Sequence, residues 1–400
     1  MKVEPLSISG MGIISSLGIG VEETWEKMLA GESGVKPVDW TTHREADYYY
    51  KDYVAKCPMN IACPVTVDVE CPREEWVKDW KYLDPAIQMA MHVTNQAVED
   101  ANLKSKRVAV IFGSLGARTT FNEGTQVMYK GRTRYSPRKS LNFEFGHMAA
   151  TVARLFKFEG PSTMVHSACS TGLTAIDYAQ KLLTCDDELD AVIVGSGDQG
   201  IEPTSAFYFG SCLNALSHTG SRPFDKSRDG FVLGEGAGAM VLQRHSLTGK
   251  YATILKVAGT TVAEHETSPD ANGSATIASA KKALGKVDAE EVGYINAHAT
   301  GTPAGDEVEY RAMKKLFPGQ VMTANKSQIG HTIGSSGIIE TAYTALALRD
   351  QMTPPVLNIK DPCDTGMILP VVSQPIDTEL AIKNNFGFGG RSYSALLEKV

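Results

Sequence analysis

Cys169 is a candidate nucleophile because of the residues around it. It lies in segment 164–172, where a short apolar run gives way to small and hydroxylated residues. Apolar residues then recur at helical spacing, at Leu173, Ile176, Ala179, Leu182 and Leu183. At a helix N-terminus, the helix dipole lowers the pKa of a thiol, and unpaired backbone N–H groups can hold an oxyanion. We therefore predict a reactive thiol, although a cysteine among small residues is also common as a packed core residue.

Two histidines occupy comparable positions. His298 follows the apolar run 292–297 and opens a loop rich in hydroxyls and glycine, and His331 lies between a short strand and a helix that begins near Gly337. The glycines in both loops permit close approach of the backbone to a ligand. Either histidine alone could be a hydrogen-bonded structural residue. Together with the Cys169 loop, the two loops predict a catalytic site of one cysteine and two histidines.

These loops, with several other segments, make the sequence resemble a β-ketoacyl synthase, the condensing enzyme of fatty-acid and polyketide synthesis in the thiolase-like superfamily. The other segments are 8–13, 24–25, 29–34, 221–231, 234–238 and 384–390. The resemblance runs nearly end to end, and an ordered set of motifs is far more specific than any one of them. It implies an α/β, thiolase-like fold with two duplicated halves in an α-β-α-β-α layered sandwich.

The resemblance also implies a mechanism. Cys169 attacks an acyl thioester, and the backbone N–H groups of Cys169 and Phe388 form the oxyanion hole. His298 and His331 promote decarboxylation of a malonyl-type extender and stabilise the enolate, which attacks the acyl-Cys169 thioester. The product is a β-ketoacyl chain, so we expect an acyltransferase.

Further residues receive roles from the same resemblance. Lys326 is a supporting catalytic residue, and Glu340 forms a buried pair with it. The residues assigned to substrate binding are Phe231, Thr300, Thr302, Gly387 and Gly389. No metal or redox cofactor is implied, because the acyl carrier protein supplies the phosphopantetheine.

The organisation of the chain agrees with an α/β fold. Short apolar runs at 108–112, 191–194, 239–242, 254–258 and 294–297 alternate with helical segments. A helix is predicted to begin at Asp84 and Pro85, a good N-cap followed by proline at the first helical position, and to run toward Ala101. We place the N-terminal half with the nucleophile at residues 1–247 and the C-terminal half with both histidines and a gate loop at residues 248–400.

Composition narrows the class of protein. A formal charge of −7 argues against general nucleic-acid binding, and no segment approaches the ~18 apolar residues of a membrane span. The seven cysteines show no CxxC pair, which favours a reduced compartment. A zinc site of Cys57, Cys63, Cys71 and His43 is conceivable, but the spacings do not match common zinc motifs. We therefore expect a soluble, cytoplasmic protein without a metal site.

The resemblance implies protein partners. The basic stretch 129–139, with Lys78 and Lys81, could dock an acidic acyl carrier protein or could simply be a solvated loop. Members of the family are usually dimers, so we expect a homodimer, and a heterodimer with a chain-length partner is the alternative.

Four positions depart from common family patterns. Arg391 and Ser392 replace the usual Thr-Asn after the Phe388 loop, Ala299 replaces a glycine after His298, and Asn214 lies where many members carry an arginine for carrier docking. We expect these changes to affect the choice of substrate and partner. One hypothesis is that Arg391 pairs with Asp270 or Glu266 and biases the gate over the acyl pocket towards closure, and the alternative is that Arg391 is a solvated surface residue.

Other functions remain alternatives. A thiolase shares the ancestry but uses a second cysteine, and Cys363 lacks the surrounding motif. A noncatalytic chain-length partner typically lacks the nucleophilic cysteine. A starter-unit synthase has asparagine in place of His331. The presence of Cys169 with both histidines favours an elongating enzyme.

Overall fold

The strands of the two halves follow one another in the same spatial order. The computed structural model describes residues 3–40, 56–115, 118–131, 134–245, 249–262 and 270–400. In the first half the order is β6 (Ser162–Val165), β5 (Val108–Gly113), β7 (Ala191–Asp198), β8 (Gly236–Arg244) and β1 (Leu6–Ser15). In the second half it is β11 (Val321–Thr323), β10 (Val292–Asn296), β14 (Leu380–Gly387), β15 (Arg391–Lys399) and β9 (Ala252–Thr261).

Strand direction repeats as well. In each half the strands lie side by side as the third, second, fourth, fifth and first in chain order, with two parallel pairings followed by two antiparallel ones. The halves join where Leu6 pairs with Ile254 and Ser7 pairs with Thr253. This is the duplication that the resemblance implies, and the sequence itself carries no repeat that would reveal it.

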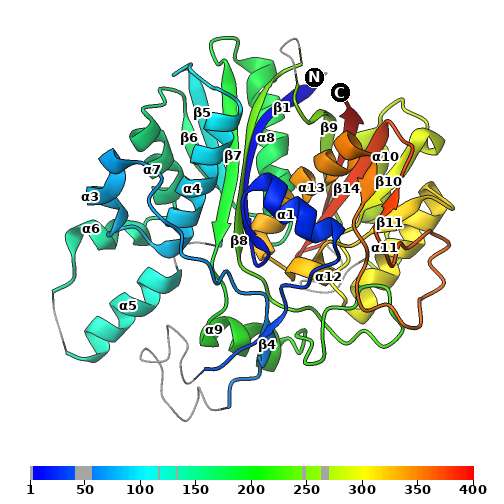
Figure 1. Ribbon diagram of the computed structural model, residues 1–400, viewed down its shortest axis with the longest axis horizontal. Helices are drawn as coiled ribbons and strands as arrows, with labels where there is room; N and C mark the ends of the chain where they lie inside the picture. The colour runs from blue at the N-terminus through cyan, green and yellow to red at the C-terminus, as the bar shows by residue number, and fades with distance from the viewer. Residues whose placement is uncertain (1–2, 41–55, 116–117, 132–133, 246–248, 263–269) are drawn as a thin grey trace.

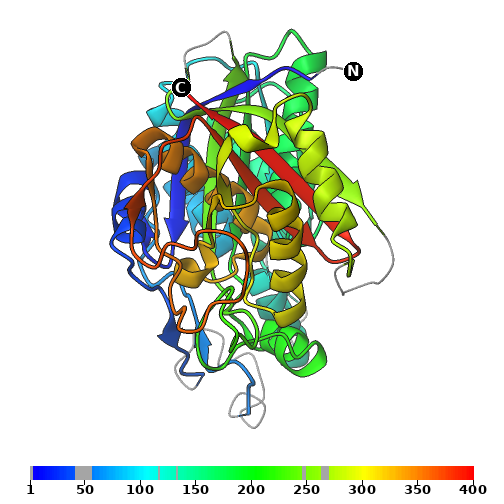
Figure 2. The same ribbon diagram turned by 90° about the vertical axis from the view of Figure 1, so that its right-hand side faces the viewer.

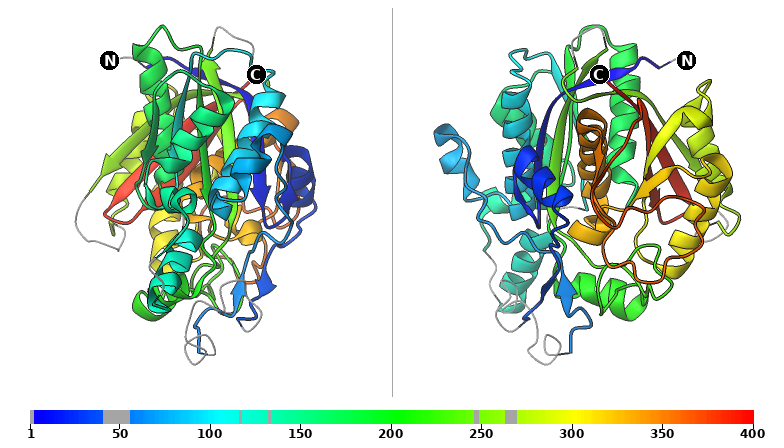
Figure 3. Two further views of the ribbon diagram at one scale, coloured as in Figure 1. Left: turned by 90° about the vertical axis from the view of Figure 1, so that its left-hand side faces the viewer. Right: turned by 45° about the vertical axis from the view of Figure 1, so that its right-hand side comes forward.

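Helices complete five layers. Helices α8 (Thr171–Cys185) and α13 (Ser336–Asp350) lie between the two half-sheets (Figure 1). On the outer face of the first half-sheet pack α4 (Pro85–Asp100) and α7 (His147–Phe156), and on that of the second pack α10 (Ser274–Leu284) and α11 (Pro303–Leu316). Figure 3 shows α13 between strands of the two halves.

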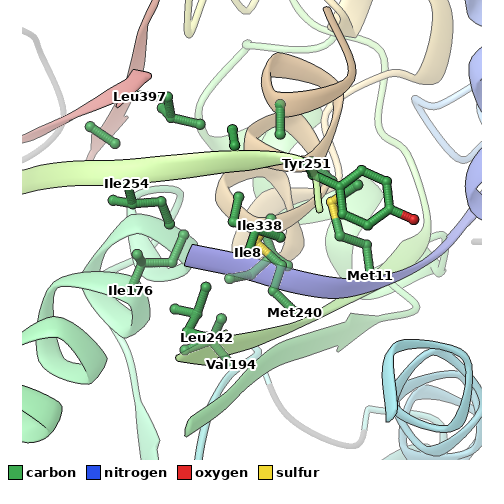
Figure 4. Close-up of a cluster of buried hydrophobic side chains, with 14 of the residues drawn as sticks. Ile8, Met11, Ile176, Val194, Met240, Leu242, Tyr251, Ile254, Ile338 and Leu397 are labelled. Atoms are coloured by element: carbon green, nitrogen blue, oxygen red, sulfur yellow. The ribbon is translucent and has the colours of Figure 1, made fainter. Parts of the chain in front are cut away.

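The central core fills the space between the half-sheets. Figure 4 shows buried side chains from both halves meeting there, including Ile8, Leu242, Ile254, Ile338 and Leu397. Full burial of an aliphatic side chain of this size stabilises a fold by about 1.5–3 kcal/mol. Because α13 is buried along nearly its whole length, it is mostly apolar or small on all sides rather than amphipathic, and its one buried charged residue is Glu340.

Helix α4 begins as its sequence predicts. The carboxylate of Asp84 accepts a hydrogen bond from the backbone N–H of Ala86 at 3.0 Å, and Pro85 occupies the first helical position. Shorter and peripheral elements are α1 (Val21–Leu29), α3 (Val77–Trp80), α5 (Arg118–Tyr129), α6 (Pro137–Ser140), α9 (Pro203–Ala206), α12 (Lys326–Ile329), β2 (Gly18–Ile19), β3 (Lys36–Pro37), β4 (Ile61–Ala62), β12 (Met352–Thr353) and β13 (Gln374–Pro375). Within the described ranges, no helix is long and apolar enough to cross a bilayer.

The two central helices touch near their N-termini. A Cβ atom on Gly172 would lie 2.6 Å from the Cα of Gly337, and one on Gly337 would lie 2.6 Å from the backbone N of Leu173. Only glycine permits this approach. It brings together the loops that precede α8 and α13, and these loops carry Cys169 and His331.

Figure 2 shows that β1 begins and β15 ends at one end of the molecule.

Candidate active site

Cys169 lies in a sharp turn between β6 and α8. Ala168 has φ +50°, in the left-handed region that non-glycine residues rarely adopt. The hydroxyl of Thr171 accepts the backbone N–H of Ser167 at 2.9 Å and donates to the carbonyl of Ala168 at 2.6 Å, and the hydroxyl of Ser170 donates to the carbonyl of Ser167 at 2.7 Å. These side chains hold the strained turn and fix the position of the thiol.

The thiol of Cys169 is buried, and this changes its acidity. Burial raises its pKa to about 12, while the positive charge of Lys326 opposes the shift and the negative charge of Asp198 adds to it. The expectation of a pKa lowered by the helix N-terminus is therefore wrong for the resting protein, because desolvation outweighs the favourable charges. At neutral pH the sulfur of Cys169 therefore carries its proton in the resting protein.

His331 presents an N–H group to the site. Its Nδ1 accepts a hydrogen bond from the backbone N–H of Ile333 at 3.3 Å and lies 3.0 Å from the hydroxyl of Ser336. A neutral imidazole has one donor and one acceptor, so the proton resides on Nε2. In the described part of the chain this Nε2 is buried and has no hydrogen-bond partner. This N–H group is therefore available to donate to a ligand. The ring of Phe231 packs edge-on against the imidazole, with 5.3 Å between the two ring centroids.

His298 is fixed through its backbone and its ring. The two carboxylate oxygens of Glu309 accept the backbone N–H groups of His298 and Ala299 at 2.8 and 2.7 Å. Ala299 has φ +28°, in the left-handed region that favours glycine. The rings of His298 and His331 lie 5.5 Å apart at an angle of 86°.

Beneath the histidines lies a buried ion cluster of Lys326, Glu340 and Lys383. The ammonium of Lys326 contacts Glu340 at 2.6 Å and donates to the carbonyl of His298 at 2.7 Å. Lys383 contacts the second carboxylate oxygen of Glu340 at 2.8 Å and donates to the carbonyl of Ala297 at 3.1 Å. Burial lowers the pKa of Lys383 to about 8, and Glu340 opposes this shift. The cluster holds the end of β10 from which His298 projects.

Both histidines are neutral. Burial, followed by the positive charge of Lys326, holds the pKa of each imidazole well below its ordinary value. Two neutral imidazoles beside a thiol can donate N–H bonds to a carbonyl oxygen that gains negative charge. With nearby backbone N–H groups, the arrangement suits acyl transfer to sulfur and the stabilisation of an enolate.

A cavity of about 320 Å³ opens onto these groups and is lined by Cys169, His298 and His331. Four of the five substrate-binding residues expected from the sequence also line it, namely Phe231, Thr300, Thr302 and Gly387, and so does Phe388 of the expected oxyanion hole. The hydroxyls of Thr300 and Thr302 are 3.0 Å apart. Gly389 lies instead in the turn after β14 with φ +80° and does not line the cavity.

Gly387 explains why a glycine-rich loop faces the nucleophile. A Cβ atom there would lie 2.6 Å from the carbonyl oxygen of Ser167 and 2.9 Å from the hydroxyl of Ser170. Any larger residue would push the loop that carries Phe388 away from Cys169.

The predicted pairing of Arg391 with Asp270 is absent. Both residues line the cavity, but the carboxylate of Asp270 caps α10, accepting the backbone N–H groups of Asn272 and Ala275 at 3.1 and 3.0 Å and the hydroxyl of Ser274. Arg391 is exposed, and no ion pair joins it to Asp270. Glu266, the other predicted partner, lies outside the described residues.

Sequence reasoning missed Glu309, Lys383 and Asn385. One signal was visible, because Lys383 directly follows the apolar run Leu380-Ala381-Ile382 in β14, and a lysine is buried only when it is paired. Among the described residues, no group of three or more histidines, cysteines or acidic residues could hold a metal ion. His43, from the conceivable zinc site, is outside these ranges.

Comparisons with known proteins agree with this geometry. The sequence matches the family description "Beta-ketoacyl synthase, N-terminal domain" over residues 3–247 and "Beta-ketoacyl synthase, C-terminal domain" over residues 251–360. It is 32% identical to 3-oxoacyl-[acyl-carrier-protein] synthase 2 of Coxiella burnetii and 30% identical to that of Vibrio harveyi, with 100% of both chains covered in each case. Among solved structures, the ishigamide ketosynthase/chain length factor has a TM-score of 0.85 at 25% identity, with 100% of both chains covered.

Proposed function

Since this chain belongs to the β-ketoacyl synthase family, we propose that it condenses an acyl thioester on Cys169 with a malonyl-type extender, as an acyltransferase of fatty-acid or polyketide biosynthesis. The observation that carries the proposal is the convergence of one buried thiol and two neutral imidazoles on a single cavity. The names of the curated relatives support an acyl carrier protein as the donor of both substrates.

In the first half-reaction the sulfur of Cys169 attacks the carbonyl carbon of the acyl thioester. The backbone N–H groups of Cys169 and Phe388 stabilise the oxyanion, and the carrier sulfur leaves. The proton that Cys169 loses is balanced by the proton that the departing carrier thiol gains. The step therefore requires no permanent base and agrees with a resting thiol whose pKa is raised.

In the second half-reaction a malonyl thioester occupies the cavity. Its carboxylate leaves as CO2, and the electron pair moves to the thioester oxygen, where the Nε2–H groups of His298 and His331 stabilise the enolate. The enolate carbon then attacks the acyl carbon on Cys169. The C–S bond breaks, the β-ketoacyl product remains on the carrier, and the cysteine sulfur regains a proton from solvent.

Intact-mass analysis tests this function. The protein is incubated with a panel of acyl carriers and then with malonyl carrier. We expect an acyl adduct after the first addition, and loss of the adduct with formation of a β-ketoacyl carrier two carbons longer after the second. Absence of any adduct across the panel would contradict the proposal.

The pKa values of the histidines predict the pH dependence of decarboxylation. Because burial and Lys326 hold both pKa values well below the ordinary value of about 6.5, the neutral imidazoles persist as the pH falls through that value. We expect the rate of malonyl decarboxylation to stay nearly constant between about pH 7.5 and pH 6, measured with a small malonyl thioester that does not require docking. A halving of the rate near pH 6.5 would show that an imidazole gains its proton there.

We also propose that an acyl carrier protein docks on the basic stretch. Lys130 and Arg134 are exposed, whereas Lys139 contacts Glu123 at 2.8 Å and Arg138 lies 3.6 Å from Asp79. The paired members have part of their charge neutralised, so Lys130 and Arg134 are the stronger candidates for attracting an acidic partner.

A dimer is part of the proposal. Strand β6 forms an edge of the sheet, and α5 projects from the layered body on the side of the first half (Figure 1). Large apolar side chains are exposed in this region, including Phe121, Met128, Phe143 and Phe145. An open edge strand with an exposed apolar surface favours burial against a second chain. A second copy is the first choice, and a chain-length partner is the alternative, as in the ishigamide ketosynthase/chain length factor.

The position of Cys363 distinguishes the proposed function from that of a thiolase. Cys363 does not line the cavity, and its sulfur instead contacts Arg228 at 2.9 Å, so Cys169 has no second cysteine beside it among the cavity-lining residues.

All seven cysteines are free thiols, which supports a reducing compartment such as the cytoplasm.

A further inference from the structure

Asn385 lies between the nucleophile and one histidine. It is on β14, two residues before Gly387, and it is fully buried. Its side-chain nitrogen Nδ2 is 3.2 Å from Nδ1 of His298 and 3.4 Å from the backbone carbonyl oxygen of Cys169. One amide group therefore touches both parts of the site.

The neighbours of Asn385 determine which way its amide faces. The carbonyl oxygen of Cys169 can only accept a hydrogen bond, so the NH2 end of the amide must face it. The same NH2 end then donates to Nδ1 of His298. The ammonium of Lys326, at 3.4 Å from Nδ1, also can only donate. Nδ1 is therefore the acceptor of the neutral ring, and the proton resides on Nε2.

Lys326 is not the main hydrogen-bond donor to Nδ1 of His298. An ammonium has three protons, and shorter contacts engage them: the two oxygens of Glu340 at 2.6 and 2.9 Å and the carbonyl of His298 at 2.7 Å. Its contact with Nδ1 is the longest of the four. Asn385 is the closer donor to that nitrogen.

The two histidines reach the same tautomer by different means. At His331 a backbone N–H, that of Ile333, supplies the bond to Nδ1, and no side-chain replacement removes it. At His298 the donors to Nδ1 are side chains, so the tautomer depends on the residue at position 385.

We propose that Asn385 is a positioning residue that fixes His298 in the tautomer with its Nε2–H directed at the substrate carbonyl, and that it ties the ring to the nucleophile loop. The inference rests on the proposed condensation for its effect on rate. Its effect on the tautomer can be measured without turnover.

The test compares Asn385→Asp with Asn385→Ala. Aspartate has nearly the shape of asparagine, but its carboxylate cannot donate and instead attracts a proton to Nδ1 of His298. We expect Asn385→Asp to slow malonyl decarboxylation by about 100-fold, as for loss of an oxyanion donor, with acyl loading changed only a few-fold. Asn385→Ala removes one donor without adding a competing acceptor, and the longer contact of Lys326 with Nδ1 remains, so it should cost less than about 10-fold. A residue that only packs would give the opposite order, because alanine removes more atoms.

Asn142→Asp is the matched control. Like Asn385, Asn142 is buried and donates to a backbone carbonyl, that of Tyr82 at 2.8 Å. The Oδ1 atom of each of these two residues has no hydrogen-bond partner among the described residues. Asn142 does not line the cavity. This variant measures the cost of a buried carboxylate in the fold, and we expect it to change the two half-reactions equally.

The second readout is the tautomer itself, from the 13C and 15N shifts of the His298 ring, assigned by the signal that His298→Ala removes. We expect Nε2–H in the wild-type protein and Nδ1–H in Asn385→Asp. Nδ1–H in the wild type, an unchanged tautomer in Asn385→Asp, or a greater loss of decarboxylation in Asn385→Ala than in Asn385→Asp would overturn the proposal. If Asn385→Asp fails to fold, the wild-type tautomer decides. If the wild type neither loads nor decarboxylates, the condensation is refuted and the ring shifts still test the positioning.

Discussion

Replacement of Cys169 by alanine is expected to abolish acyl loading and condensation. In the proposed mechanism the sulfur of Cys169 is the atom that bonds to the acyl group, and the cavity is lined by no other cysteine within the described residues. The fold should survive, because the turn around Cys169 is held by Thr171 and Ser170 rather than by the thiol. We expect a loss of stability of about 1 kcal/mol, typical of a small change in a buried side chain. Intact mass and a thermal melt measure the two effects.

Cys71→Ala is the control for this variant. Cys71 is partly buried, packs against the outer core beside α4 and donates to the carbonyl of Arg73 at 3.2 Å, away from the cavity. It should load acyl groups normally. Normal loading of Cys169→Ala would mean that a different residue accepts the acyl group.

His331→Ala is expected to slow malonyl decarboxylation by about 100-fold or more, and His298→Ala by a similar factor. Each change removes one Nε2–H donor to the enolate oxygen. Acyl loading should fall much less, because the backbone N–H groups of Cys169 and Phe388 support that step. Release of CO2 from malonyl carrier and acyl adduct formation, measured on the same samples, separate the two half-reactions.

Glutamine at position 331 provides the matching control. The side-chain NH2 of glutamine can reach approximately the place of Nε2 and donate there, whereas alanine cannot. His331→Gln should therefore recover part of the decarboxylation lost in His331→Ala. Equal and modest losses in both half-reactions, without recovery by glutamine, would mean that the histidine only supports the fold.

Much of the fold could be predicted from local signals. The N-cap at Asp84, the helix after Cys169 and the apolar strand runs are all present as expected. The duplication could not be read from the residues, because the two halves share strand order rather than sequence. The close contact between α8 and α13 at Gly172 and Gly337 could not be predicted from the sequence either, because a contact between residues so far apart along the chain leaves no periodic pattern.

The site also contains residues that the local sequence predicts and residues that only the folded structure reveals. Cys169 and His298 are recognisable because each follows a strand and has a glycine nearby in the chain, whereas the short helix α12 (Lys326–Ile329) separates His331 from β11. The acidity of the thiol was not predictable, because burial depends on all five layers and it outweighs the helix N-terminus. Lys383 and Asn385 were missed because a strand places alternate residues on opposite faces, and only the folded structure shows which face meets His298.

The most direct test of the account is a single-turnover measurement of coupling. Cys169 is first loaded with an acyl group and freed of excess carrier, and malonyl carrier labelled with 13C at its free carboxyl is then added. We predict loss of the acyl adduct together with an equimolar release of 13CO2 and an unlabelled product extended by two carbons. Release of 13CO2 while the adduct stays on Cys169, or loss of the adduct as a free acid, would contradict the condensation.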